Sequence, residues 1–270
     1  MRQALALEYD GRGFCGFQSQ PSRCSVQDAL ERALGAIAGA PVRVVAAGRT
    51  DAGVHATSQI VHFDARVPRP PSAWVRGVNA HLPPAAAALW CVGVPDDFHA
   101  RFAARARHYA YLLLNRPERP GLASGHVGWH HEPLDAAAMQ AAARRLVGTH
   151  DFSSFRAAEC QARSPVKTIS DLRVVRAGSI IRIDVSADAF LHHMVRNVVG
   201  ALVAVGAGKR PPAWIAELLE AADRMTGRAR RCADRTSTHP CLWRTSGPTR
   251  AHSAGASSRR STSTRRVPRR

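Results

Sequence analysis

The segment Gly48-Arg49-Thr50-Asp51-Ala52-Gly53-Val54-His55-Ala56 separates two apolar stretches, Val42–Ala47 and Gln59–Asp64, whose residue pattern predicts strands. Two glycines around an aspartate are typical of a tight loop. In such a loop Arg49 can hold the Asp51 carboxylate in its charged form. The spacing alone fits equally well an Asx turn, in which the aspartate only hydrogen-bonds its own backbone. The segment therefore predicts a strand-loop-strand unit with Asp51 at its centre.

Strands and helices alternate around this unit through the first hundred residues. Residues 3–9 alternate apolar and polar side chains, which predicts a strand running into the turn D-G-R-G. Ser25 opens S-V-Q-D, a capping-box pattern, and apolar residues follow at helical spacing up to Gly39. A short helix over 72–82 and a strand over 87–94 complete the order β-α-β-β-α-β.

The second part of the chain repeats this order without its last strand. The predicted elements are a strand starting at Arg107, a helix over 134–147, a strand pair at 167–176 and 179–185, and helices over 191–205 and 214–222. We therefore expect an α+β fold of two related lobes, residues 1–104 and 105–223, with a cleft between them.

The net charge of +18 is concentrated at the C-terminal end. Residues 224–270 carry 13 arginines and one acid, Asp234, a net charge of +12, whereas residues 1–223 carry only +6. Such a balance favours a polyanionic partner. Because residues 224–270 show no periodicity and run into Ser, Arg and Thr repeats, we expect this tail to be disordered and the last strand of the second lobe to be missing.

Composition argues against a membrane protein and against a disulfide-rich secreted one. The 270 residues are 45% apolar, yet no run of 18 or more apolar residues occurs. The stretch M-R-Q-A-L-A-L-E-Y-D does not read as a secretory signal. Six scattered cysteines without a C-x-x-C pair suggest neither a zinc site nor disulfides. We expect a cytoplasmic protein with reduced thiols and no membrane partner.

Two further motifs suggest a nucleotide-binding site and a metal site, but the sequence around each motif argues against such a ligand. Residues 11–16 match G-x-G-x-x-G, but no helix starts at these glycines, as nucleotide binding requires, so a turn that lets the backbone approach a neighbour is preferred. The pair His192-His193 invites a metal site. If both lie on a helix their side chains diverge by about 100° and cannot share an ion, so we expect no metal.

Eight ordered motifs together resemble the tRNA pseudouridine synthase A family, collinearly from about residue 3 to Asp223. They are Y-D-G-R-G-F-C-G-F-Q, S-V-Q-D-A-L, A-G-R-T-D-A-G-V-H-A, V-N-A-H-L-P, V-P-D-D-F-H-A-R-F, Y-A-Y-L-L-L-N, G-T-H-D-F-S-S-F-R and F-L-H-H-M-V-R-N-V-V-G. The resemblance implies the pseudouridine synthase fold, in which mixed or antiparallel sheets of the two lobes flank a basic RNA-binding cleft. It also implies a cofactor-free isomerase, and a homodimer that turns uridine into pseudouridine in the tRNA anticodon stem and loop.

The implied reaction explains why one aspartate carries the chemistry. The bond from C1′ to N1 breaks, the uracil turns, and the sugar rejoins through C5, so neither a metal nor a small-molecule cofactor is required. The reaction needs a carboxylate beside the sugar, either as nucleophile at C1′ or as base at C2′. The resemblance places this role on Asp51. The sequence leaves both routes open.

The resemblance also assigns partners to Asp51. It implies that Arg196 pairs with the carboxylate and that Tyr109 lies against the target base, where a stacked ring contributes about 1–3 kcal/mol. Contacts to RNA phosphates are expected from further basic residues, which are Arg49, His55, Arg101, Arg105 and Arg107.

The chain departs from the family pattern in two places. Phe17 stands near a position where the family usually shows tryptophan, and the Arg/Ser-rich tail stands where family members continue with a last strand. A frame shift near Arg224 and a genuine basic extension both explain the tail. Two other functions stay open: a non-catalytic tRNA-binding or tRNA-folding protein, and a pseudouridine synthase acting on another RNA.

Overall fold

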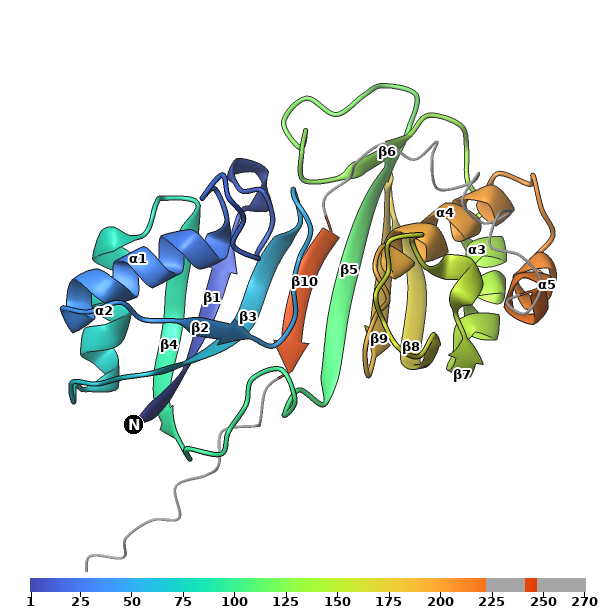
Figure 1. Ribbon diagram of the computed structural model, residues 1–270. Helices are drawn as coiled ribbons and strands as arrows, with labels where there is room; N and C mark the ends of the chain where they lie inside the picture. The colour runs from blue at the N-terminus through green and yellow to red at the C-terminus, as the bar shows by residue number, and fades with distance from the viewer. Residues whose placement is uncertain (222–240, 247–270) are drawn as a thin grey trace, which may run out of the picture.

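The computed structural model describes residues 1–221 and 241–246. Two α+β halves lie side by side and meet at a central strand (Figure 1). The strands are β1 (Arg2–Tyr9), β2 (Val44–Ala46), β3 (His55–Asp64), β4 (Ala86–Val94), β5 (Ala106–Asn115), β6 (Gly128–His130), β7 (Gly148–Asp151), β8 (Val166–Ala177), β9 (Ile180–Ala187) and β10 (Cys241–Ser246).

In the described residues the strands form one sheet in the order β4-β1-β3-β10-β5-β9-β8-β7, with β2 beside β3 and β6 beside β5. Strands β1, β3 and β4 pair antiparallel, as do β5, β9, β8 and β7. The predicted α+β fold is confirmed. The two halves, however, share one continuous sheet, because β10 runs parallel to β3 and antiparallel to β5.

The prediction of a tail without a strand is wrong for Cys241–Ser246. Strand β10 places Trp243 in register with Ala56 of β3 on one side and with Tyr109 of β5 on the other. Tryptophan and threonine within this stretch are strand-favouring residue types, but the Arg- and Ser-rich sequence around them shows no strand pattern. The remaining tail, 224–240 and 247–270, lies outside the described residues.

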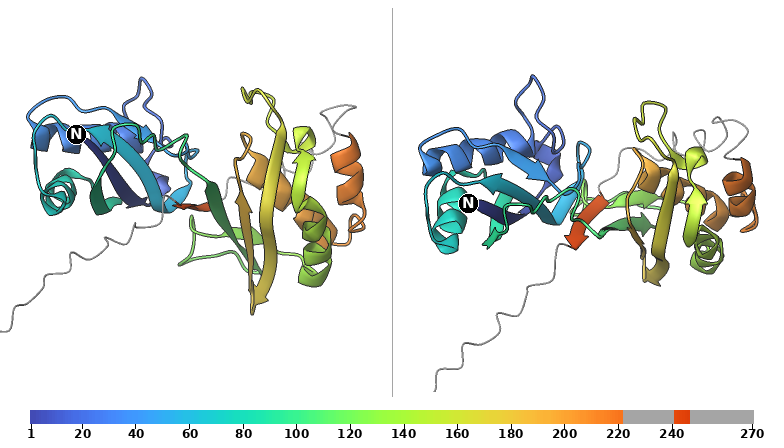
Figure 2. Two further views of the ribbon diagram at one scale, coloured as in Figure 1. Left: turned by 90° about the horizontal axis from the view of Figure 1, so that it is seen from below. Right: turned by 60° about the horizontal axis from the view of Figure 1, so that its bottom comes forward.

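Helices pack on each half of the sheet and lie at opposite ends of the molecule (Figure 2). In the first half, α1 packs against α2 and α2 against β4, whereas in the second half α3 packs against α4 and β8. The helices are α1 (Val26–Ala38), α2 (Pro71–His81), α3 (Ala136–Ala143), α4 (Met194–Gly206) and α5 (Trp214–Glu220). No helix in the described ranges combines the length and apolar character needed to cross a membrane.

Helix α1 begins and ends where its sequence predicts. The Ser25 hydroxyl accepts from the Asp28 backbone N–H at 3.1 Å, and the Ser25 N–H donates to the Asp28 carboxylate at 3.2 Å. These two bonds satisfy donors that a helix start leaves open. Gly39 ends the helix at φ 69°, in the left-handed region that favours glycine. The buried Leu30 and Leu34 then fix the helix on the core.

Two boundaries around the Asp51 loop differ from the sequence prediction. Strand β2 is shorter than 42–47, and β3 starts at His55 rather than Gln59. His55 and Ala56 therefore belong to the sheet and not to the loop. The first residue of a buried strand is held more tightly than a loop residue, which matters for the position of Asp51.

Candidate active site

A cavity of about 840 Å³ lies between the two halves, beside the Asp51 loop. Residues of both halves form the walls of this cavity, so the cavity depends on the contact between the halves. Polar, basic and aromatic residues that line it are Arg49, Thr50, Asp51, Arg101, Arg107, Tyr109, Glu159, Phe190, His192, His193 and Arg196. Four predicted site residues, Asp51, Arg196, Tyr109 and Arg49, thus face one space.

The Asp51 carboxylate is surrounded by nitrogen atoms from the second half. Arg196 Nη2 lies 3.7 Å from Asp51 Oδ2. His192 Nε2 lies 3.7 Å from Oδ1, and His193 Nε2 lies 3.6 Å from Oδ2. All four side chains are partly exposed to the cavity. Three nitrogen-bearing side chains thus surround a carboxylate that remains open to a ligand.

The histidine pair does not lie on a helix, which corrects the sequence argument about it. Helix α4 begins only at Met194, and His193 adopts φ 59° just before it. This turn stacks the two imidazoles with ring centroids 4.0 Å apart and aims both at Asp51. The geometric reason given for excluding a shared ion therefore does not hold, since three ligand atoms of Asp51, His192 and His193 lie within 4.8 Å of one another.

Burial lowers the pKa of His193, and the neighbouring His192 and Arg196 lower it further, whereas Asp51 raises it. The net direction favours the neutral imidazole at neutral pH. Arg196 is then the permanent positive charge next to Asp51. The sequence motif F-L-H-H-M-V-R-N contained both histidines, but the turn that aims them at Asp51 has no clear sequence signal.

Tyr109 enters the cavity from β5. Its ring meets Phe190 edge to face, with centroids 5.0 Å apart. Such a contact fixes the orientation of an aromatic ring that a flat base can stack on. Phe190 is a residue that the sequence reasoning missed.

Residues 9–17 support the Asp51 loop, residues 47–54 between β2 and β3, through hydrogen bonds and close packing. The hydroxyls of Tyr9 and Thr50 lie 2.7 Å apart, and Phe17 N donates to Thr50 O at 2.9 Å. Burial raises the pKa of Tyr9 to about 12, so this hydroxyl stays protonated. A Cβ on Gly16 would lie 2.9 Å from Thr50 O. The glycine-rich motif thus serves close backbone approach, as expected, and the neighbour it approaches is the Asp51 loop.

The basic candidates separate by position. Arg49 and Arg101 line the cavity, and Arg105 is not among its lining residues. Arg107 lines it too, but its guanidinium donates to the carbonyls of Asp188 and Ala47, which fixes it to the protein. Arg49 and Arg101 are therefore the arginines best placed to meet a phosphate.

His55 does not line the cavity. Its side chain is buried, and its ring contacts Asp10, Gly11 and Gly125 instead. The phosphate contact suggested for His55 by the sequence has no support in this position. The reason is the early start of β3, which turns His55 inward.

The expectation of no disulfide is wrong at Cys15 and Cys24. Their sulfurs are bonded, with Cα atoms 5.6 Å apart. Cys15 N donates to Cys24 O at 3.1 Å, so the loop between them already brings the two residues together. Scattered spacing in the sequence did not reveal this approach.

Two α+β halves that join an aspartate, an arginine and an aromatic ring in one cavity match the arrangement expected of an enzyme that isomerises uridine in RNA. The sequence model of the tRNA pseudouridine synthase family matches residues 5–103 and 142–241, and the chain belongs to this family. The resemblance seen in the sequence and the enzyme class, an isomerase, are thereby confirmed.

Relatives named tRNA pseudouridine synthase A match this chain over most of their length. The chain is 61% identical over 224 residues to the tRNA pseudouridine synthase A of Thiobacillus denitrificans, covering 83% of this chain and 86% of the relative. It is 61% identical over the same shares to that of Dechloromonas aromatica. It is 60% identical over 225 residues to that of Chromobacterium violaceum, again covering 83% and 86%.

Proposed function

We propose that this protein converts uridine to pseudouridine in the anticodon stem and loop of tRNA, with Asp51 as the reacting carboxylate. The observation that carries the proposal is the contact between Asp51 and Arg196 across a cavity that Tyr109 also lines. The cavity volume falls within the ~300–1,000 Å³ of small-ligand pockets, so it suits one nucleotide turned out of its helix.

The reaction balances without another reactant. The C1′–N1 bond breaks and a C1′–C5 bond forms, C5 loses a proton, and N1 gains one. Asp51 acts as nucleophile at C1′ or as base at C2′, and both routes need it ionised. Arg196 keeps this charge stable when RNA expels water from the cavity. Tyr109 offers the face on which the uracil stacks while its bond to the sugar is broken.

The RNA backbone is expected to run along the basic rim of the cavity. Arg49 and Arg101 supply charges that bind phosphates and do not read sequence. Selection of the anticodon arm, assembly as a homodimer and the absence of a cofactor rest on the family resemblance, whereas action in the cytoplasm rests on the composition of the sequence.

The test uses purified full-length protein and unmodified tRNA transcripts labelled with tritium at C5 of uridine. We expect tritium release, and mapping of the product is expected to place pseudouridine in the anticodon arm. Binding of tRNA without release would favour the tRNA-binding alternative. Release only from another RNA would favour a different substrate. Sedimentation of the same sample tests the dimer.

A further inference from the structure

Neighbouring residues fix the Asp51 loop at both ends. The contacts at one end lie within the first half, whereas the contacts at the other end join both halves. At one end, Thr50 is bonded to Tyr9 and Phe17, which belong to the same half. At the other end, His55 lies four residues after Asp51 and contacts residues of both halves. The second anchor is therefore sensitive to how the halves are docked.

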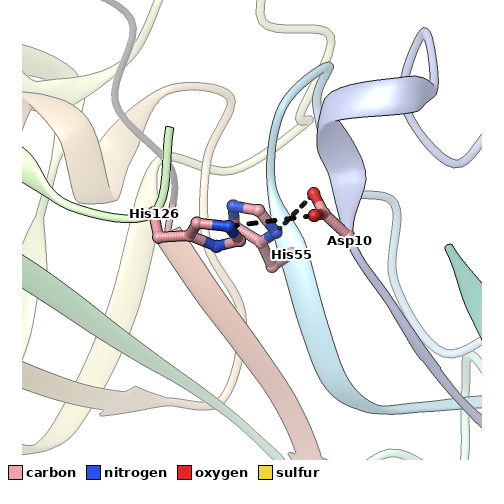
Figure 3. Close-up of side chains that lie close together, drawn as sticks. All are labelled: Asp10, His55 and His126. Atoms are coloured by element: carbon pink, nitrogen blue, oxygen red, sulfur yellow. Dashed lines mark ion pairs between the residues drawn. The ribbon is translucent and has the colours of Figure 1, made fainter. Parts of the chain in front are cut away.

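His55 is held at both ring nitrogens. Nε2 lies 3.0 Å from the carbonyl oxygen of Gly125, which can only accept, so Nε2 donates. Nδ1 lies 3.1 Å from Asp10 Oδ1, to which a protonated ring donates, and 3.3 Å from Gly11 N, which donates to Nδ1 when the ring is neutral. Figure 3 shows Asp10, directly after β1, and His55, at the start of β3, pointing toward each other, and β1 and β3 are neighbouring strands. Only 4% of His55 is exposed, so the ring has no room to turn away.

Asp10 is itself oriented by Arg12. The Arg12 Nε lies 3.0 Å from both carboxylate oxygens of Asp10. This hydrogen bonding is the largest factor that lowers the pKa of Asp10, to about 2. The carboxylate next to His55 is thus charged at all working pH values. Gly125 in turn belongs to the segment between β5 and β6 of the second half, where Arg12 also approaches Ser124 O at 3.5 Å.

We propose that His55 is a positioning residue for the proposed isomerisation: paired with Asp10 and Gly11 of one half and bonded to Gly125 of the other, it holds Asp51 in line with Arg196. The inference rests on the proposed function. The two reacting-site residues come from different halves, Asp51 from the first and Arg196 from the second. The bond of His55 to Gly125 joins the same two halves four residues after Asp51, and it therefore helps to fix the distance between Asp51 and Arg196.

A metal-binding role for the same cluster predicts something different. His126 stacks on His55 with centroids 4.9 Å apart, and its Nε2 lies 3.9 Å from Asp10 Oδ2. Asp10, His55 and His126 offer three ligand atoms within 4.8 Å. Arg12 already occupies the Asp10 carboxylate, which favours the positioning role. A metal ion would require His126, whereas positioning does not, so the His126→Ala variant separates the two.

The experiment compares His55→Ala and His55→Gln with His126→Ala as the matched control. Single-turnover tritium release, the Kd for tRNA and the Tm are measured for each full-length protein. We expect His55→Ala to lose about 10–100-fold in rate, because a displacement near 1 Å at a reacting group costs on that order. The Kd should stay within about threefold, because RNA affinity comes mostly from phosphate contacts.

Two further readouts separate positioning from simple stability. His55→Gln retains an amide N–H that can reach the Gly125 carbonyl, so we expect it to recover part of the rate. The rate losses of Asp10→Asn and His55→Ala should not add in the double variant, because both break the same contact. His126→Ala should stay within about twofold of wild type.

Each result decides. A wild-type rate in His55→Ala at unchanged Tm overturns the positioning role while leaving the proposed function intact. An equal loss in His126→Ala, restored by added Zn²⁺, overturns it in favour of a metal site. The positioning role is also overturned if three results occur together. The lower Tm of His55→Ala fully explains its loss of rate, His55→Gln recovers no rate, and the rate losses of Asp10→Asn and His55→Ala add in the double variant. An inactive wild-type protein contradicts the proposed function itself.

Discussion

Arg196 Nη2 lies 3.7 Å from Asp51 Oδ2, and the two residues come from opposite halves of the molecule. Asp51 stands in the loop before β3, whereas Arg196 stands in the first turn of α4. Their contact joins the two halves at the wall of the cavity.

Replacing Arg196 tests the pairing directly. We expect Arg196→Ala to lower the single-turnover rate by about 10²–10³-fold, the usual cost of removing one fixed charge-stabilising group from an active site. Arg196→Lys should recover little, because a flexible ammonium does not replace a planar guanidinium. Near-normal rates in the lysine variant would mean that Arg196 supplies only positive potential.

Tyr109 is tested by separating its ring from its hydroxyl. Tyr109→Leu should weaken capture of the flipped base by about 1–3 kcal/mol, because the stacking face is lost. Tyr109→Phe keeps the ring against Phe190 and should retain tRNA binding. A fall in its rate alone would assign the hydroxyl to removal of the C5 proton. A fully active leucine variant would exclude a stacking role.

Gly11 and Gly13 form a matched pair for the support of the Asp51 loop. A Cβ on Gly11 would lie 2.6 Å from the Val54 carbonyl carbon, whereas a Cβ on Gly13 meets nothing within 4 Å. We expect Gly11→Ala to cost about 1–3 kcal/mol of unfolding free energy and to displace the loop, with a loss of turnover. Gly13→Ala should behave like wild type in thermal melts and in the assay. Equal Tm values for both variants would contradict the packing described.

Strand β10 is tested with two truncated chains. Ending the chain at Pro240 removes the strand between β3 and β5, exposes two sheet edges and should lower the Tm strongly. Ending it at Ser246 keeps the strand and removes seven arginines. This chain should keep its Tm and lose non-specific RNA affinity that high salt already abolishes. If both chains melt like the full protein, β10 contributes nothing to the sheet.

The origin of the tail is a separate question. The frame-shift hypothesis rests on a missing last strand, and β10 supplies a strand in the present frame. Two explanations of the tail remain, a frame shift near Arg224 and a basic extension. Sequencing the genomic DNA around codon 224 and translating the other frames decides between them. A family-like last strand in another frame would support the frame shift.

Local patterns predicted most of the elements, and the reason is visible at α1. The Ser25 and Asp28 capping box and Gly39 are signals carried by neighbouring residues, so they do not depend on the rest of the fold. Strand β10 could not be predicted in this way. Its position between β3 and β5 depends on backbone pairing with residues more than a hundred positions away.

The residues of the site likewise fall into those that the sequence predicts and those that depend on the folded structure. Asp51, Arg196 and Tyr109 were predicted through family motifs, and the cavity brings them together. The approach of His192 and His193 to Asp51 depends on the left-handed conformation of His193, which no residue type announces. The burial of His55 depends on where β3 begins. Both are tertiary effects that a linear pattern does not contain.

The most direct test of the account is Asp51→Asn, measured both for pseudouridine formation and for tRNA affinity. Glu118→Gln, an exposed carboxylate that does not line the cavity, serves as the control. The account predicts that Asp51→Asn abolishes tritium release while the Kd for tRNA stays within about threefold, because phosphate contacts carry affinity and the carboxylate carries the chemistry. Substantial tritium release by Asp51→Asn would contradict the central claim that this carboxylate performs the reaction.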